Sequence, residues 1–152
     1  MKSIFLSFAA LMISVTMFAQ TQAAAAAGVT VKKAENYVKF KELTYNFGKI
    51  KKDVRVEHEF AFSNISEKPV VIESAFGSCG CTTPVWPQAP VAKGKTDKLV
   101  AGFTAPAVGP FTKTITVKLA GVESPMNLTI TGEVLTPEEY AKFEKEKGSK
   151  KS

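Results

Sequence analysis

The sequence predicts an all-β protein in which antiparallel sheets pack face to face as a β-sandwich. Apolar and polar residues alternate with a period of two along several short stretches, and turn-forming residues separate these stretches. No helical period stands between them. Because successive side chains of a strand point to opposite faces, this alternation indicates strands with one buried face. Short half-buried strands divided by frequent turns are typical of sandwiches of antiparallel sheets.

The expected strands follow this alternation along the chain. The clearest stretches are residues 54–63, 111–119 and 126–134, and shorter candidates cover 43–47, 70–76 and 99–103. Their inward-facing apolar positions predict a core of Val56, Phe60, Phe62, Val70, Ile72, Phe103, Ile115, Val117, Leu128 and Ile130. His58 is the polar residue on the apolar face of its stretch, and we interpret it as a core histidine rather than a ligand.

The N-terminus has the pattern of a secretory signal peptide. Lys2 precedes an uncharged run, residues 4–18, which is shorter than the about 20 apolar residues that cross a membrane. We therefore expect residues 1–23 to be a signal peptide, with cleavage after Ala19 or Ala23, and residues 24–42 to be a lead-in. The mature protein would be exported, either periplasmic or secreted, and would have no transmembrane segment.

The C-terminus has the signals of a short helix. Thr136 is a typical N-cap residue, Pro137 takes the first helical position, and Glu139 stands three residues after the cap, as in a capping box. The sandwich domain is therefore expected at residues 43–135, and residues 136–152 are expected to form a short helix and a basic tail.

Charge and motifs exclude two classes of function. The chain carries 20 Lys and Arg against 14 Asp and Glu, a formal net charge of +6, but its lysines are scattered. Nucleic-acid-binding proteins concentrate basic residues in one stripe or patch, so we expect no nucleic-acid partner. The sequence contains no Gly-x-Ser-x-Gly, no His-Glu-x-x-His and no phosphate-binding glycine loop. We therefore predict that the protein is not an enzyme.

A group of motifs within residues 43–134 carries a resemblance to a known family. These motifs are Phe47-Gly48, Phe60-x-Phe62-x-Asn64, Ser78-Cys79-Gly80-Cys81-Thr82-x-Pro84, Trp86-Pro87, Gly109-x-Phe111 and Leu128-x-Ile130-x-Gly132-x-Val134. With them the chain resembles the bacterial Ig-like domain of unknown function numbered 1573, which is similar to Hydin-type Ig-like domains. The resemblance implies an exported Ig-like module. It brings no established reaction, and a shared fold does not define a function.

The only two cysteines of the chain, Cys79 and Cys81, stand on either side of Gly80, and three interpretations remain open. Export to an oxidising compartment permits a disulfide between them. A disulfide is estimated to contribute about 3 kcal/mol when it closes a loop of about 15 residues. A loop with one intervening residue gains less. Cα atoms two residues apart in an extended strand are about 6.6 Å apart, near the upper end for a disulfide, so the bond would be strained and therefore labile.

The second interpretation is a soft-metal site, and the third is a pair of free structural thiols. Thiolates two residues apart suit two-coordinate Cu(I). A structural zinc site uses four Cys or His ligands, and this chain has two Cys and one His. In the third interpretation, Cys79 and Cys81 are small apolar groups that pack near Trp86.

We predict an exported, non-catalytic Ig-like binding or structural module of the cell envelope, monomeric or weakly associating, with no cofactor. Edge strands of sandwiches accept strands of other proteins, so the expected partner is an envelope protein or peptide. The candidate binding residues are Cys79, Gly80, Cys81 and Trp86, and Trp86 either anchors a partner or closes one end of the core. The alternative is a thiol-redox or copper-binding protein that uses Cys79 and Cys81.

Overall fold

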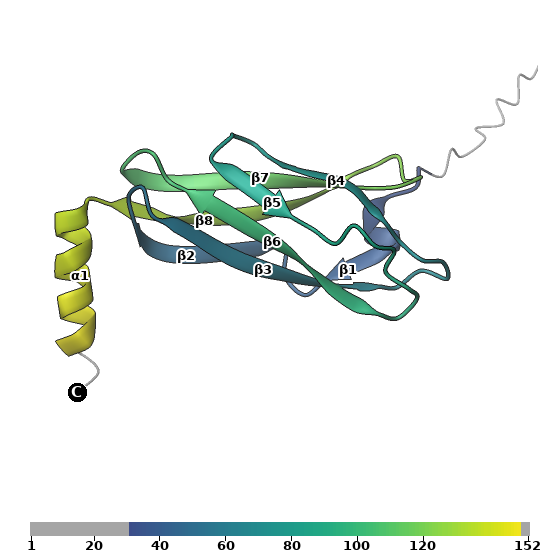
Figure 1. The fold of residues 1–152 in the computed structure, drawn as a ribbon, viewed down its shortest axis with the longest axis horizontal. Coiled ribbons are helices and arrows are strands. Elements are labelled where there is room, and N and C mark those ends of the chain that lie inside the picture. The colour runs from purple at the N-terminus through teal and green to yellow at the C-terminus, as the bar shows by residue number, and fades with distance from the viewer. Residues whose placement is uncertain (1–30, 150–152) are drawn as a thin grey trace, which may run out of the picture.

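The computed structural model describes residues 31–149, which form a sandwich of two four-stranded sheets with one helix at the end (Figure 1). The predicted signal peptide, residues 1–23, lies outside the described residues, as do residues 24–30 and 150–152. Export therefore stays a prediction from the sequence.

The strands divide evenly between the sheets. The first sheet has the order β1 (Val38–Phe40), β3 (Arg55–Asn64), β6 (Thr96–Thr104), β5 (Thr82–Val85). The second has the order β2 (Thr44–Lys51), β8 (Met126–Leu135), β7 (Gly109–Leu119), β4 (Ile72–Gly77). A 3-10 helix, η1 (Ala34–Asn36), precedes β1, and the helix α1 (Pro137–Ser149) follows β8.

The pairing is antiparallel except between β2 and β8, which run parallel. The sequence predicted antiparallel sheets, so the second sheet is a correction: it is mixed. Alternation of apolar and polar residues indicates which face of a strand is buried, but it carries no information on the direction of the neighbouring strand. The chain leaves β1 in the first sheet and joins the second at its outer edge, where β2 lies beside β8.

The predicted lead-in, residues 24–42, was wrong in its C-terminal part. Strand β1 pairs with β3, with Val38 opposite Asn64 and Phe40 opposite Phe62. Ala34, Val38 and Phe40 are buried. The sandwich therefore begins before residue 43. Two apolar residues around one lysine are too short a pattern to indicate a strand by alternation alone.

The core lies between the two sheets and follows the prediction closely. Every predicted core residue is buried except Val56, which is partly buried. Phe60 and Phe62 from β3 and Ile115 and Leu128 from the facing sheet are fully buried. Burying one such side chain stabilises the fold by about 1.5–3 kcal/mol.

His58 lies on the inner face of β3, as the alternation predicted, but it is only partly buried. Its side chain is 18% exposed and lies between the sheets, where it stacks on the ring of Tyr45 with 3.4 Å between centroids. Its Nε2 lies 2.8 Å from Oε1 of Glu42. The apolar side of the ring thus packs against β2, while a polar atom reaches an exposed carboxylate.

Helix α1 begins with the predicted capping box. The Thr136 backbone N–H donates to Oε2 of Glu139 at 3.0 Å, and the Glu139 N–H donates to Oγ1 of Thr136 at 3.2 Å. The backbone hydrogen bond from Thr136 lowers the pKa of Glu139 below its ordinary value of 4.5. The helix stands at one end of the sandwich (Figure 1), where Lys49 lies over the Phe143 ring. Among residues 31–149 no helix is long and apolar enough to cross a membrane.

Candidate functional site

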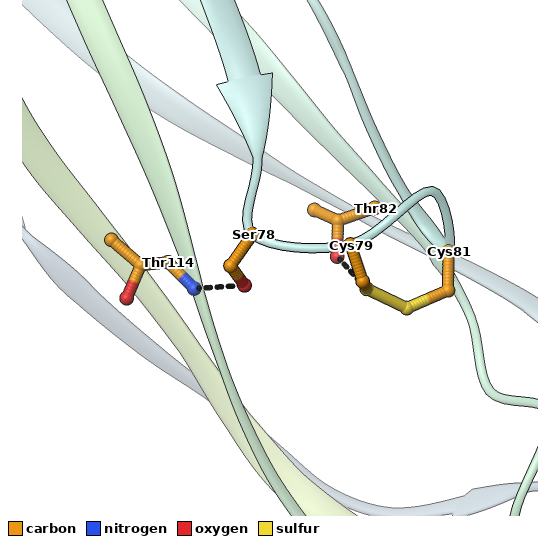
Figure 2. The surroundings of a disulfide bond; sticks show 5 residues. All are labelled: Ser78, Cys79, Cys81, Thr82 and Thr114. Atoms are coloured by element: carbon orange, nitrogen blue, oxygen red, sulfur yellow. Dashed lines mark hydrogen bonds between the residues drawn. A yellow bond between two sulfur atoms is a disulfide. The ribbon is translucent and has the colours of Figure 1, made fainter.

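The two cysteines are joined in a disulfide, and their Cα atoms lie 5.2 Å apart (Figure 2). Neither Cys79 nor Cys81 is free in the structure, so the interpretation as free structural thiols does not describe it. The copper alternative needs two thiolates, and the bonded sulfurs do not supply them. Within residues 31–149 no three Cys, His, Asp or Glu side chains gather as a metal site.

The disulfide lies in a tight turn that carries the chain from one sheet to the other. Strand β4 of the second sheet ends at Gly77, and β5 of the first sheet begins at Thr82. The Thr82 N–H donates to the carbonyl of Cys79 at 3.1 Å, which closes a four-residue turn. The disulfide therefore spans the tip of a connection between the sheets.

Both ends of this turn are held by the neighbouring strands. The Ser78 N–H donates to the carbonyl of Thr114 at 2.8 Å. The Thr114 N–H donates to Oγ of Ser78 at 3.2 Å (Figure 2). On the other side, the Thr104 N–H donates to the carbonyl of Cys81 at 3.0 Å. These hydrogen bonds position the turn without using either sulfur.

The two glycines of the segment differ in their role. A Cβ on Gly77 would lie 2.5 Å from both Cβ and the carbonyl oxygen of Thr82, so only glycine fits this close approach. Gly80 is exposed at the tip, where a Cβ would meet nothing within 4 Å. The backbone angle φ of Gly80 is not positive, so its conformation does not require glycine either. Gly80 was a candidate site residue, but Gly77 is the glycine that the turn requires.

Thr82 is the residue of this site that sequence reasoning passed over as a polar turn neighbour. It is 4% exposed, and its Oγ1 lies 3.6 Å from Sγ of Cys79 (Figure 2). A disulfide sulfur carries no hydrogen, so the threonine hydroxyl donates this hydrogen bond. The buried hydroxyl thus has a sulfur atom as its partner.

Trp86 is partly buried and packs against the core just after β5. Within the described residues its Nε1 is buried and has no hydrogen-bond partner. This placement matches the alternative in which Trp86 closes one end of the core. The exposed apolar side chains near the turn are instead Phe76 on β4 and Val85 on β5, 57% and 60% exposed.

A β-bulge turns Phe76 outward. The register of β4 on β7 shifts between Ile72 and Ser74, so that Ile72 and Ala75 both face the core. Phe76 then lies opposite Thr116 on the outer face of the sheet. Bulges near sheet edges commonly redirect a side chain in this way.

Strands β4 and β5 are open edges on the same side of the sandwich. Within residues 31–149, β4 pairs with β7 alone and β5 pairs with β6 alone, so each has backbone groups without a partner strand from this part of the chain. Strand β5 is short and contains Pro84, which has no N–H to donate, so this edge is less able to pair with another strand. Residues 74–77 of β4 contain neither proline nor lysine, so β4 is the more accessible edge.

The structure does not bring His58 to the cysteines. His58 lies opposite Ala101 of β6, which in turn lies opposite Pro84 of β5. A full strand therefore separates the histidine from β5, and its partners are Glu42 and Tyr45.

The fold places the chain among Ig-like and PapD-like β-sandwiches. A PapD-like domain of human CEP192 is similar, with a TM-score of 0.53 at 7% identity over 66% of this chain and 87% of that one. A protein of unknown function from Porphyromonas gingivalis has a TM-score of 0.54 at 10% identity, over 70% of this chain and 50% of that chain. The Vibrio cholerae protease VesB matches with a TM-score of 0.53 at 13% identity, over 66% of this chain and 33% of that chain. At these identities the likeness shows the fold alone.

A comparison of the sequence with models of protein families shows which family the chain belongs to. A family model described as "Protein of unknown function (DUF1573)" matches residues 38–134, and the chain belongs to this family. The match begins at the first residue of β1, which is further evidence that the sandwich starts before residue 43. No curated protein matches the chain.

Proposed function

We propose that this protein is an exported, non-catalytic binding module of the bacterial cell envelope, and that it binds an extended segment of a partner protein along the edge of β4. The observation that carries the proposal is the open β4 edge with Phe76 turned outward beside the disulfide turn. Export rests on the signal-peptide pattern of residues 1–23, and the absence of catalysis rests on the lack of catalytic motifs in the sequence.

The edge of β4 offers both parts of strand recognition. Unpaired backbone groups along residues 74–77 can hydrogen-bond to a partner strand, and a side chain at every second position gives specificity. A partner strand beside β4 would place one of its side chains next to Phe76. Cross-strand pairs of this kind contribute about 0.2–1 kcal/mol each, so several are needed for a stable complex.

The outer face beside this edge indicates the chemistry of the partner. Phe76 lies opposite Thr116, which lies opposite Asn127. In the next row of the sheet, Thr114 lies opposite Thr129. These neighbours are uncharged, and the two charges in the row on the other side of Phe76, Lys118 and Glu73, pair with each other at 3.0 Å. A strongly charged partner requires unpaired opposite charges nearby. We therefore propose an uncharged extended segment rich in β-branched or aromatic residues.

A site-specific photo-crosslinker tests the proposal. Placed at Phe76 in cells of the source bacterium, it is expected to label one defined segment of an envelope protein. The same crosslinker at Ile65, which is 51% exposed in the loop between β3 and β4, is the matched control. Equal labelling from both positions would contradict the proposal.

A binding measurement then uses the labelled segment as a synthetic peptide. Wild-type protein and Ile65→Lys are expected to bind it equally, while Phe76→Lys weakens binding at least about tenfold, because a lysine at an edge opposes strand addition. Both substitutions replace exposed side chains and should leave stability within about 0.5 kcal/mol of the wild type. Wild-type affinity in Phe76→Lys would exclude the β4 edge as the binding site.

A further inference from the structure

The Cys79–Cys81 disulfide does not hold the turn in place. It closes a loop with one intervening residue, and the entropic gain from a disulfide decreases as the loop shortens. Backbone hydrogen bonds from Thr82 to Cys79 and from Thr104 to Cys81 position the same segment. By thermodynamic linkage, a disulfide that adds little to folding receives little protection against reduction from folding.

The turn is open to a reactant from outside. Cys79 and Cys81 are both partly exposed, with one side of Cys81 packed against the core, and Gly80 between them is exposed. Exposed disulfides are the labile, regulatory or catalytic ones, whereas structural ones resist reduction. A thiolate can therefore approach this bond without unfolding the sandwich.

Thr82 makes the two sulfurs chemically different. Its buried hydroxyl donates to Sγ of Cys79 at 3.6 Å (Figure 2). A disulfide sulfur is a weak acceptor, and a hydrogen bond to a charged acceptor is stronger. The hydrogen bond therefore strengthens when Cys79 becomes a thiolate. A sulfur that is stabilised as a thiolate is the better leaving group in exchange.

We propose that the Cys79–Cys81 disulfide is a thiol-exchange site, in which Cys81 is attacked and Cys79 leaves as a thiolate held by the hydroxyl of Thr82. The reactant class is a dithiol. One of its thiolates forms a bond to Sγ of Cys81, and the electron pair of the Cys79–Cys81 bond leaves with Cys79. One disulfide is broken and one is formed, so this first step involves no net oxidation.

The second thiolate of the dithiol completes the reaction. It attacks the sulfur of the reactant in the mixed disulfide, and Cys81 leaves with the electron pair. The dithiol is then oxidised to a disulfide, while Cys79 and Cys81 are reduced and take up the two protons that the dithiol released. In this scheme Thr82 is a positioning residue, because it acts through Cys79.

The first experiment maps the mixed disulfide. Oxidised protein is treated with reduced glutathione, quenched with acid, and free thiols are blocked before peptide mapping by mass spectrometry. We expect glutathione on Cys81 and the blocking group on Cys79. Glutathione on Cys79 would overturn the assigned roles. If excess dithiothreitol leaves the bond intact in the folded protein, the exchange site itself is overturned.

The second experiment tests Thr82 with variants that keep its shape or its hydroxyl. In Thr82→Val, reduction by dithiothreitol is expected to be about three- to tenfold slower than in the wild type, while Thr82→Ser keeps the hydroxyl and restores the rate. Thr83→Val is the control, because the Thr83 hydroxyl accepts a hydrogen bond from Arg55. This variant should be reduced by dithiothreitol at the wild-type rate. Equal rates in all four proteins would overturn the role of Thr82.

A pH profile separates this role from a structural one. In the reduced protein carrying Cys81→Ser, alkylation of Cys79 is expected to reach half its maximal rate at a pH about one unit higher when Thr82→Val is added. An unchanged profile would contradict stabilisation of the thiolate. The exchange does not rest on the proposed partner binding, because these measurements use small thiols and an alkylating reagent. Ile65→Lys, whose side chain lies outside both the β4 edge and the turn, should be reduced at the wild-type rate.

Discussion

Replacing both cysteines, Cys79→Ser with Cys81→Ser, should leave the sandwich folded and only moderately less stable. The disulfide closes a loop of residues 79–81, and the chain-entropy relation gives about 1.6 kcal/mol for a closed loop of three residues. The backbone hydrogen bonds of the turn do not involve the sulfurs and remain. A serine at position 79 also leaves the hydroxyl of Thr82 a hydrogen-bond partner.

Thermal unfolding monitored by circular dichroism in oxidising buffer checks this expectation. A domain of this size loses about 4–6 °C in Tm per kcal/mol, so the fall should not exceed about 10 °C. Wild-type protein measured with excess dithiothreitol is the internal control, and its Tm should fall by a similar amount. A much larger fall, or loss of cooperative unfolding on reduction, would refute the reasoning, because it would show that the bond holds the fold together.

Three further predictions concern the turn, the core and the helix. Gly77→Ala should lower the free energy of unfolding in urea by about 1–3 kcal/mol, while Gly80→Ala should change it little, because of these two positions only residue 77 has no room for a methyl group. Equal urea midpoints for the two variants would contradict the close contact between Gly77 and Thr82. Leu128→Ala should cost about 2–5 kcal/mol in the same assay, and a smaller loss would mean that the core collapses around the cavity. The pKa of Glu139 is lowered, so the carboxylate stabilises α1 above the ordinary pKa and this stabilisation is lost as pH falls through the lowered value. Helical circular dichroism should fall over that acid range in the wild type but not in Glu139→Gln, and identical titrations would exclude the cap.

The sequence predicted those parts of the fold in which alternation runs long enough to be unambiguous. Strands β3, β7 and β8 each repeat the pattern over about ten residues, and their inward positions form the core. Strands β1 and β5 have three and four residues, which is too short for a periodic signal. In β5, Pro84 argues against a strand, yet an edge strand tolerates it.

The exposed apolar residues of the site could not be predicted, because a bulge reverses the alternation. A regular strand that buries Ile72 would also bury Phe76, four residues later. The shift between Ile72 and Ser74 buries Ala75 instead and exposes Phe76. The extra residue of a bulge leaves no reliable mark in a single sequence. For Val85, the strand itself was missed, so its face was not assigned.

The cysteines were recognisable as a site, but their state was not. A spacing of two residues is compatible with a disulfide, with two metal-bound thiolates and with free thiols, and only the backbone path distinguishes them. The turn closed by Thr82 brings the Cα atoms of Cys79 and Cys81 to 5.2 Å, within the usual range for a disulfide. The same turn buries the Thr82 hydroxyl against one sulfur, a contact that residue types alone do not indicate.

The position of the turn connects the two proposals without making either depend on the other. Strand β4 continues directly into Ser78 and Cys79, so a segment bound along β4 toward Gly77 ends beside the disulfide. A cysteine at that end of the segment would be held near Cys81, and holding reactants together raises exchange rates far above those of free thiols. A bound segment that contains two cysteines should therefore reduce the protein faster than dithiothreitol at equal concentration. This advantage should disappear in Phe76→Lys, while reduction by dithiothreitol itself stays unchanged. If the advantage persists in that variant, the disulfide recognises its reactant without the β4 edge.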